Sequence, residues 1–597
     1  MEEGKPGRWQ RLQKLSFNRK DLTRRMRRAE GVTIRHARKF IFHRLDNVRE
    51  VRRHIIMWVV AVGVLIGASG LQLMWYQHNY QTAAAASNGT YAEAVLGPLN
   101  TLNPLFASDS AEESASQLLF SRLLSYDTTG HLSNDLASKV VVDGSGKVYT
   151  VTIRPDARWS DGIHLTAKDI IFTVGLLQNP AVHSTITGWN NISVKMIDDM
   201  TVSFTLPAIY AAFEHALTFP ILPEHILSGV APNALRENDF STNPVGSGPF
   251  KLRFIQNIDV TGGHRIVHME RNADYYKGAS VLERFQLLIY ATSDEIIKAL
   301  TSGEVNAASD LSATDVAQIN QAHYVVRNSP IQSGVYAILN TTSATLQDKA
   351  VRQALQVGTD TAAIRKDLTP GTPALDLPFT NGQLTGDVPK APAYNLAAAQ
   401  KILNDDGWKL DGTTRKKDGI SLKLNIVTTK DTDYERVLET LAGQWRTLGI
   451  TVNTLVVNPA DASQGFVQNI LQPRTYDVLL YQLTIGADPD VYAYWHSSQI
   501  GVQGLNFSNY ANAISDDALA SARSRLEPEL RNNKYLTFAH EWLADVPAIG
   551  LYQSTMHYVY STSASPYKDT NVLVSPLDRY ADVQYWSVGT SLVFKTP

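Results

Sequence analysis

The chain has 597 residues, with 55 Lys and Arg against 57 Asp and Glu and a formal net charge of −2. It contains no cysteine, which excludes disulfides, thiolate metal sites, thiol nucleophiles and a lipidated cysteine at a membrane. Residues 1–54 hold 17 Lys and Arg against 6 Asp and Glu, whereas the rest of the chain holds 38 against 51. This acidic remainder argues against nucleic acid as a partner.

An uncharged stretch from Ile55 to Tyr76 follows the basic N-terminal segment and is rich in Ile, Val, Leu, Met and Trp. A helix of this length spans a bilayer core, at ~1.5 Å per residue against ~30 Å of hydrocarbon. A secretory signal has an apolar core of only ~7–15 residues, so we predict a retained transmembrane anchor. The positive-inside rule places residues 1–54 in the cytoplasm and the main domain outside the cell membrane. Residues 77–88 are polar and Ala-rich, which predicts a linker.

The next part of the chain has the local signals of a globular α/β protein. Val140–Val142 and Tyr149–Ile153 flank the turn cluster Asp143–Gly146, which predicts a β-hairpin. Thr166 and Asp169 have the spacing of a capping box in front of an apolar run. We therefore expect a helix to begin there.

Strand and helix patterns alternate again in the C-terminal half. Apolar residues alternate with polar ones over 422–426 and then recur at helical spacing from Val437 to Leu448. Gly449 is expected to end the helix, and Ile450–Val452 to begin another strand. This order predicts a βαβ unit with a parallel strand pair and a right-handed crossover.

Motifs of catalysis and of cofactor binding are missing from the sequence. Gly246-Ser247-Gly248 lacks the third glycine of a dinucleotide fingerprint. Asp488-Pro489-Asp490 lacks the further oxygens and the distal Glu of a calcium loop. We therefore predict no catalytic residue, no metal site and no cofactor, and we do not expect an enzyme.

One stretch near the C-terminus is unusually rich in aromatic and polar side chains. Rings with a polar edge suit a ligand cleft, because they give contact area at little entropic cost and fix orientation. The alternative, that most of these residues are core or surface aromatics between strands, fits at least half of them. The stretch contains Tyr476, Tyr481, Asp488, Asp490, Tyr492, Tyr494, Trp495, His496, Asn506, Phe507, Asn509 and Tyr510.

A series of short blocks carries a resemblance to a known family. Examples are Leu102-Asn103-Pro104-Leu105, Arg158-Trp159-Ser160-Asp161-Gly162 and the block from Asp488 to Ser498. In this order, over about 480 residues, the blocks resemble the family 5 extracellular solute-binding proteins, the oligopeptide and dipeptide receptors of ABC importers. The other blocks are 119–127, 149–154, 165–172, 244–252, 351–355, 397–403, 407–408, 476–478 and 547–552.

The resemblance implies a fold class: α/β, with two lobes hinged across a cleft as in periplasmic binding proteins, and an extra domain that enlarges the cleft for peptides. One transmembrane helix would precede this three-domain fold. The expected boundaries are 89–125, 241–332 and 556–597 for lobe I, 126–240 for the extra domain, and 333–555 for lobe II.

The resemblance also implies a function and site residues. A peptide would be captured by cleft closure and delivered to ABC permease subunits. In well-studied relatives an Asp in an Ala-Asp-Tyr context pairs with the peptide's α-amino group, and here its equivalent is Asp488, is Asp490, or is absent. Gly246 and Gly248 are expected as the hinge. The expected ligand-binding residues are Asp488, Asp490, Tyr481, Tyr494, Trp495, Asn506 and Asn103.

Two alternatives remain open at the level of the sequence. The same fold could bind another solute, such as a sugar oligomer or a metal chelate. An ectodomain that senses a ligand and signals through the basic cytoplasmic segment would need no permease. In either case we expect a monomer held in the lipid bilayer by Ile55–Tyr76.

Overall fold

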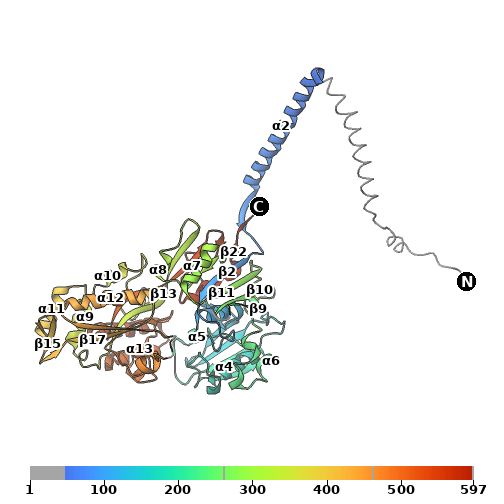
Figure 1. The fold of residues 1–597 in the computed structure, drawn as a ribbon. Coiled ribbons are helices and arrows are strands. Elements are labelled where there is room, and N and C mark those ends of the chain that lie inside the picture. The colour runs from blue at the N-terminus through green and yellow to red at the C-terminus, as the bar shows by residue number, and fades with distance from the viewer. Residues whose placement is uncertain (1–47, 260–262, 460, 462, 595–597) are drawn as a thin grey trace. The chain divides into compact units, whose positions relative to one another are not determined.

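The computed structural model describes residues 48–259, 263–459, 461 and 463–594. It divides into two compact units, one of Met1–Ala84 with Ser591–Pro597 and the other of Ala85–Thr590 (Figure 1). The predicted basic cytoplasmic segment lies outside the described residues, except for its last seven positions.

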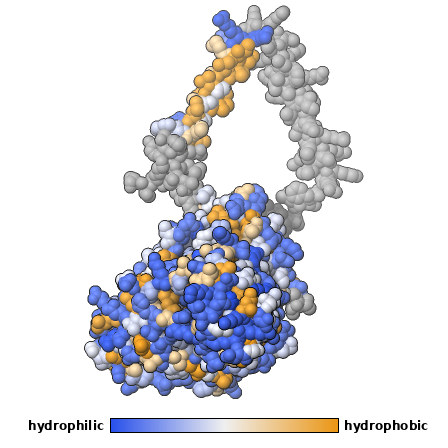
Figure 2. All heavy atoms as spheres, turned by 90° about the vertical axis from the view of Figure 1, so that its left-hand side faces the viewer, coloured by the Kyte–Doolittle hydropathy of each residue, from blue (hydrophilic) through white to orange (hydrophobic). Residues whose placement is uncertain are grey.

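The first unit contains helix α2, Val48–Tyr80. Within the described residues, Arg52–Tyr76 is the one helical stretch long and apolar enough to cross a membrane, and its side chains are exposed. Figure 2 shows the apolar side chains along this helix. The stretch contains the predicted span Ile55–Tyr76.

The segment predicted as a linker is partly regular. Helix α2 continues to Tyr80, because residues 77–80 include neither Gly nor Pro to end it. Residues Gln81–Ala85 then form strand β1, which pairs with β23, Thr590–Phe594. Part of the predicted linker thus has regular secondary structure, and its role as a linker stays a prediction.

The second unit is built on a mixed ten-stranded sheet, the central sheet, with the order β18-β17-β19-β13-β20-β12-β2-β11-β10-β9. In Figure 1, β17 lies toward one end of this sheet and β9, β10 and β11 toward the other. The strands are β2 Thr90–Leu96, β9 Phe250–Asp259, β10 His264–Arg271, β11 Arg284–Tyr290, β12 Ala307–Ala308, β13 Tyr324–Leu339, β17 Lys423–Thr429, β18 Thr451–Val457, β19 Val478–Thr484 and β20 Ala548–Ser561.

Strands β13 and β20 join the two ends of the central sheet. They are 16 and 14 residues long and pair antiparallel over most of their length. The register shifts between Pro330 and Gly334 and again between Val335 and Tyr336. Pro330 has no N–H to donate, and an irregularity of this kind bends a strand. The two ends of the sheet are therefore connected through a bulged pair of strands.

Both faces of the central sheet are covered, as alternation along its strands requires. Val335, Ala337 and Leu339 of β13 enter one core with residues of α9, α11 and α12. Tyr336 and Ile338 enter the opposite core with residues of α14 and α15. At the other end of the sheet, β2 and β11 divide their side chains between two further cores in the same way.

Smaller sheets and the helices surround the central sheet. A four-stranded sheet has the order β5-β6-β8-β7, with β5 Ala137–Val142, β6 Val148–Ile153, β7 Ser193–Asp198 and β8 Thr201–Thr205. The short strands are β3 Leu124–Tyr126, β4 Leu132–Asn134, β14 Lys409–Asp411, β15 Thr414–Lys417, β16 Ile420–Ser421, β21 Ala564–Ser565 and β22 Ser587–Val588. The helices are α3 Ser110–Leu119, α4 Ala167–Gln178, α5 Phe213–Ala216, α6 Glu224–Leu227, α7 Ser293–Ser302, α8 Ala313–Val316, α9 Lys349–Val357, α10 Thr361–Lys366, α11 Leu396–Asp405, α12 Thr432–Thr447, α13 Tyr492–Trp495, α14 Ala513–Arg523 and α15 Pro528–Asp545.

The three local predictions are confirmed. Strands β5 and β6 form the expected antiparallel hairpin. Thr166 N donates 2.8 Å to Asp169 Oδ2 in a capping box at the start of α4. Strands β17 and β18 are parallel and are joined through α12, which makes the predicted βαβ unit.

Candidate ligand-binding site

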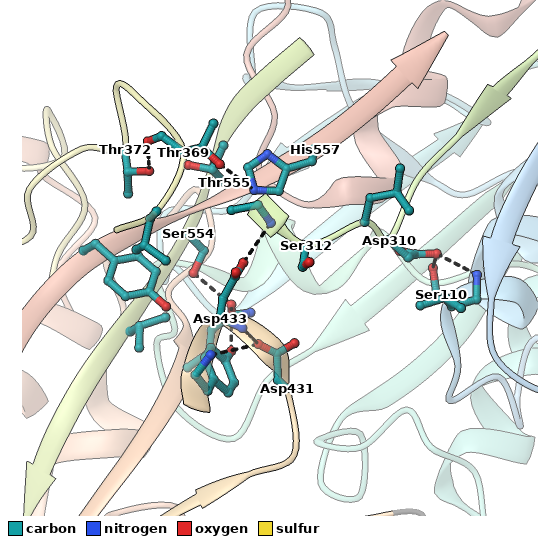
Figure 3. A pocket seen from close by; sticks show the side chains of 18 of the residues that line it. Ser110, Asp310, Ser312, Thr369, Thr372, Asp431, Asp433, Ser554, Thr555 and His557 are labelled. Atoms are coloured by element: carbon teal, nitrogen blue, oxygen red, sulfur yellow. Dashed lines mark hydrogen bonds between the residues drawn. The ribbon is translucent and has the colours of Figure 1, made fainter. Parts of the chain in front are cut away.

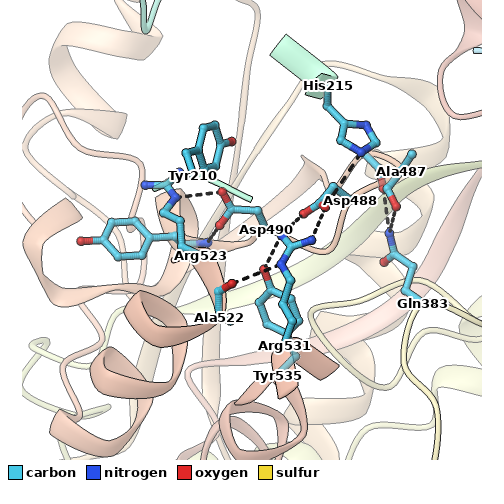
Figure 4. Close-up of polar contacts among 12 residues, drawn as sticks. Tyr210, His215, Gln383, Ala487, Asp488, Asp490, Ala522, Arg523, Arg531 and Tyr535 are labelled. Carbon is cyan, nitrogen blue, oxygen red and sulfur yellow. Dashed lines mark hydrogen bonds and ion pairs between the residues drawn. The ribbon is translucent and has the colours of Figure 1, made fainter. Parts of the chain in front are cut away.

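The predicted carboxylates Asp488 and Asp490 lie between β19 and α13, and each is paired with an arginine (Figure 4). Asp488 accepts two hydrogen bonds of 2.5 Å from Arg531, Nη1 to Oδ2 and Nη2 to Oδ1. Arg523 Nε donates to Asp490 Oδ2 at 2.9 Å. The side chains of Asp488 and Arg531 are only 12% and 13% exposed. Both carboxylate charges are therefore already compensated inside the protein.

The groups around these pairs add no free charge. His215 Nε2 lies 3.9 Å from Asp488 Oδ2, and burial lowers the pKa of His215, so its imidazole is neutral at pH 7. Burial acts to lower the pKa of Arg531, but the hydrogen bonds and charge of Asp488 outweigh burial and raise that pKa. A ligand ammonium that binds Asp488 would therefore share a carboxylate whose charge Arg531 already compensates.

Trp495 and Asn506 lie in the interior. Trp495 is 1% exposed, and its ring meets Trp542 edge-on at a centroid distance of 5.5 Å. Asn506 is fully buried, and its Nδ2 donates to the backbone oxygens of Tyr510 at 2.9 Å and His496 at 3.2 Å. Both were expected to contact ligand. In this conformation neither side chain has an exposed face. Their contacts hold the segment around α13 in place.

The remaining predicted contacts are also engaged within the fold. Tyr481 packs edge-on against Phe507 at 6.0 Å, and the Tyr494 hydroxyl donates to the Thr484 carbonyl at 2.9 Å. Asn103 is fully buried, and among the described residues its Nδ2 has no hydrogen-bond partner. The structure thus brings Asp488 and Asp490 together but does not gather all seven predicted residues into one exposed site.

Gly246 and Gly248, expected as a hinge, pack against the C-terminal end of α3. A Cβ on Gly246 would lie 2.0 Å from the Leu119 carbonyl oxygen, and one on Gly248 would lie 2.6 Å from that of Leu118. Gly248 N donates to Leu119 O at 2.9 Å. Glycine is therefore required here for a close backbone approach, and the hinge role of Gly246 and Gly248 stays a prediction.

A separate cavity of about 490 Å³ is lined by residues from both ends of the central sheet (Figure 3). Gly97 follows strand β2, Asp310 follows β12, and Asp431 follows β17. In open α/β sheets, ligands bind outside the carboxyl ends of strands. Several other lining residues carry a hydroxyl group: Ser110, Ser312, Thr369, Thr372, Ser554 and Thr555.

The N-terminus of α12 supplies two of the lining carboxylates. Asp431 Oδ1 accepts from Asp433 N at 2.9 Å and from Tyr434 N at 3.0 Å, which caps the helix. Asp433 Oδ2 accepts from Ala313 N at 3.1 Å, at the start of α8. Burial raises the pKa of Asp433. Asp433 therefore links α12 to α8 across the cavity.

Asp310 and His557 line the cavity from other elements. Asp310 has a positive φ of 61°, and its Oδ2 accepts from Leu96 N and from Ser110 Oγ at 3.2 and 2.8 Å. His557 is 8% exposed, and burial lowers its pKa to about 4. Its Nδ1 lies 2.8 Å from Asn328 Oδ1. His557 is therefore neutral at physiological pH and contributes no positive charge.

The cavity aspartates were missed by reasoning from the sequence. The βαβ unit was predicted, and Asp431 stands between its first strand and its helix, where a cap and a ligand site are both common. That position was a usable signal. Asp310 carried no comparable signal, because its place beside α12 depends on pairing between distant strands.

Comparison with known proteins identifies the family of this chain. The model of the bacterial extracellular solute-binding proteins, family 5 middle, matches residues 131–503, more than half of the chain. The oligopeptide-binding protein AppA of Bacillus subtilis is 27% identical over 489 residues, which is 79% of this chain and 88% of AppA.

Solved structures share the fold. The structure of Bacillus subtilis AppA in complex with a nonapeptide has a TM-score of 0.69 at 24% identity and matches 85% of this chain and all of AppA. NikZ from Campylobacter jejuni in complex with Ni(L-His) has a TM-score of 0.70 at 24% identity, over 83% of this chain and 99% of NikZ. These neighbours have the multi-domain α/β fold predicted from the sequence. The chain belongs to the family 5 bacterial extracellular solute-binding proteins.

Proposed function

We propose that this solute-binding protein captures peptides and delivers them to the permease of an ABC importer. The observation that carries the proposal is the cavity of about 490 Å³ between the two ends of the central sheet. Its volume is in the range of small-ligand sites, about 300–1,000 Å³. The name of AppA as an oligopeptide-binding protein supports peptide as the class of ligand.

We also propose that the ligand is enclosed by closure about β13 and β20. The irregular pairing of these strands near Pro330 and Gly334 supports a pivot there, in addition to the predicted hinge at Gly246 and Gly248. Ala211 N donates to Arg523 O at 2.9 Å, so the proposed extra domain and lobe II are already in contact in this conformation. The moving parts are lobe I (89–125, 241–332 and 556–597), the extra domain (126–240) and lobe II (333–555).

The amine-binding role of Asp488 or Asp490 stays a prediction, as do the contacts of Tyr481, Tyr494, Trp495, Asn506 and Asn103. For the carboxylates, the amine-binding role requires that the ligand ammonium share Asp488 with Arg531 or Asp490 with Arg523, or displace that arginine. The paired geometry favours the arginines as the resident cations.

Material that copurifies with the full chain tests the peptide proposal. We expect that protein extracted in detergent, washed and then denatured releases a mixture of peptides, identified by liquid chromatography and mass spectrometry. The same extraction from cells without the gene is the control. Release of a metal chelate or a sugar oligomer in place of peptides would show that the ligand class is wrong.

We propose that α2 anchors the protein in the cell membrane as a single pass, with the basic segment inside and the monomeric binding domain outside. Length, apolarity and flanking charge support this topology. Protease added to intact cells should digest the binding domain and leave residues 1–54 protected, which immunoblotting of an N-terminal tag would detect. A mature N-terminus near Ala85 would contradict the retained anchor.

A further inference from the structure

The cavity between the two ends of the central sheet has an unusual balance of charge. Four aspartates are among its lining residues, and none of them lies in an ion pair of 4.0 Å or less with a described residue. No described lining residue is Lys or Arg. Its one histidine, His557, is neutral above a pKa of about 4. The four aspartates are Asp109, Asp310, Asp431 and Asp433.

Two oxygens of the lining residues are buried without a partner among the described residues, Asp433 Oδ1 and Thr555 Oγ1. Buried polar atoms in folded proteins are nearly always hydrogen-bonded, so an orphaned pair beside a cavity indicates a group that binds there. An acceptor-only carboxylate oxygen needs a donor. A ligand group that pairs with this oxygen therefore donates a hydrogen bond to it, and a cationic group donates the strongest one.

The nearest arginine does not meet this need. Arg436 is one turn along α12 from Asp433, but its Nη1 donates to Asp367 O at 2.5 Å and its Nη2 donates to Thr314 Oγ1. Arg436 lines the adjoining cavity of about 670 Å³. Its charge acts to lower the pKa of Asp433, less strongly than burial raises it.

The arginine-paired aspartates provide the contrast. Asp488 and Asp490 each have a cation within 2.9 Å, whereas within the described residues Asp431 and Asp433 accept hydrogen bonds from backbone N–H groups only. Unlike Asp488 and Asp490, the cavity aspartates therefore offer a ligand cation carboxylates that have no ion pair with a described residue. We infer that the cavity is a cation subsite, in which Asp431 and Asp433 at the N-terminus of α12 hold an ammonium or guanidinium group of the ligand.

This inference rests on the proposed function for the nature of the rest of the ligand. The preference of the cavity for a cationic group does not depend on that function. For peptides, the subsite selects those that place a lysine or arginine side chain, or the α-ammonium, in the cavity. A carboxylate placed there would face four like charges. The subsite therefore rejects acidic side chains and a free C-terminus.

Calorimetry on the full chain in detergent tests the subsite with defined probes. The peptides are N-acetylated, C-amidated Ala-Ala-Xaa-Ala-Ala with Lys, Gln or Glu at Xaa, together with the free-amine, C-amidated pentaalanine. Spermidine is a non-peptide cation. We expect the Lys or the free-amine peptide to bind about 10-fold to 100-fold more tightly than the Gln peptide, and the Glu peptide to bind most weakly.

Variants then locate the charge preference. In the double variant Asp431→Asn and Asp433→Asn, asparagine keeps the helix cap and the shape, and the preference for Lys over Gln should disappear. Asp517→Asn removes an exposed carboxylate of α14 and should leave the preference intact. If Asp488→Asn abolishes the preference and the double variant keeps it, the subsite is wrongly placed.

The outcomes separate the two proposals. Equal affinity for the Lys, Gln, Glu and free-amine peptides overturns the subsite and leaves peptide capture standing. Binding of spermidine, weakened by the double variant, without binding of any peptide supports the subsite and overturns peptide as the ligand class. Binding of none of the probes overturns both.

Discussion

Replacing Arg579 with Met should lower the free energy of unfolding by about 3–5 kcal/mol, the usual effect of leaving one member of a buried ion pair alone. Arg579 and Glu93 are fully buried, with Arg579 Nη2 2.8 Å and Nε 3.0 Å from Glu93 Oε1. The hydroxyls of Tyr580 and Tyr558 donate to the same carboxylate at 2.7 and 2.8 Å. Without the guanidinium, Glu93 would be a buried charge with only neutral donors.

The position of this network explains the size of the expected effect. Glu93 belongs to β2, Tyr558 to β20, and Arg579 to a 3₁₀ segment, Pro576–Tyr585, near the C-terminus. Arg579 also donates to Ser114 Oγ of α3 at 3.0 Å. The network therefore joins the beginning of the second unit to its end.

Urea unfolding of the full chain in detergent, followed by far-UV circular dichroism, measures the loss. The matched control is Arg154→Met, which removes a surface pair with Asp156 and should cost less than about 1 kcal/mol. The double variant Glu93→Gln and Arg579→Met should recover part of the loss, because it removes the unpaired charge. Equal stabilities of Arg579→Met and Arg154→Met would show that the buried pair does not support the fold.

Local patterns in the sequence were sufficient for local structure. The β5–β6 hairpin, the Thr166 capping box and the βαβ unit around α12 each depend on residues close together in the chain. Their periodicity and turn residues were therefore readable directly. The same holds for α2, whose apolar span needs no tertiary contact to be recognised.

The site was less predictable, because its properties depend on residues far apart in the chain. Asp488 is neutralised by Arg531, 43 positions away, and no spacing rule relates the two. Aromatic residues occur in both clefts and cores, so the sequence alone did not indicate that the Trp495 ring packs against Trp542 in this conformation. The cavity aspartates Asp310 and Asp431 follow β12 and β17 in the chain. They line the same cavity because these two strands belong to one sheet.

The central claim, that the protein encloses a peptide by closing two lobes, predicts a large change in a measured distance. The chain lacks cysteine, so Lys168→Cys on α4 and Asn533→Cys on α15 provide two unique sites for spin labels. Both positions are exposed. They lie in the proposed extra domain and in lobe II, so closure should bring the labels together.

Pulsed electron paramagnetic resonance on the doubly labelled full chain measures this distance with and without a saturating pool of synthetic pentapeptides. The control pair, Lys168→Cys with Lys195→Cys, lies within the proposed extra domain and should keep its distance. The account predicts that the α4–α15 distribution becomes narrower and shifts to shorter distances when peptide is present. An unchanged distribution, with the same pool shown by calorimetry to bind the labelled protein, would contradict it.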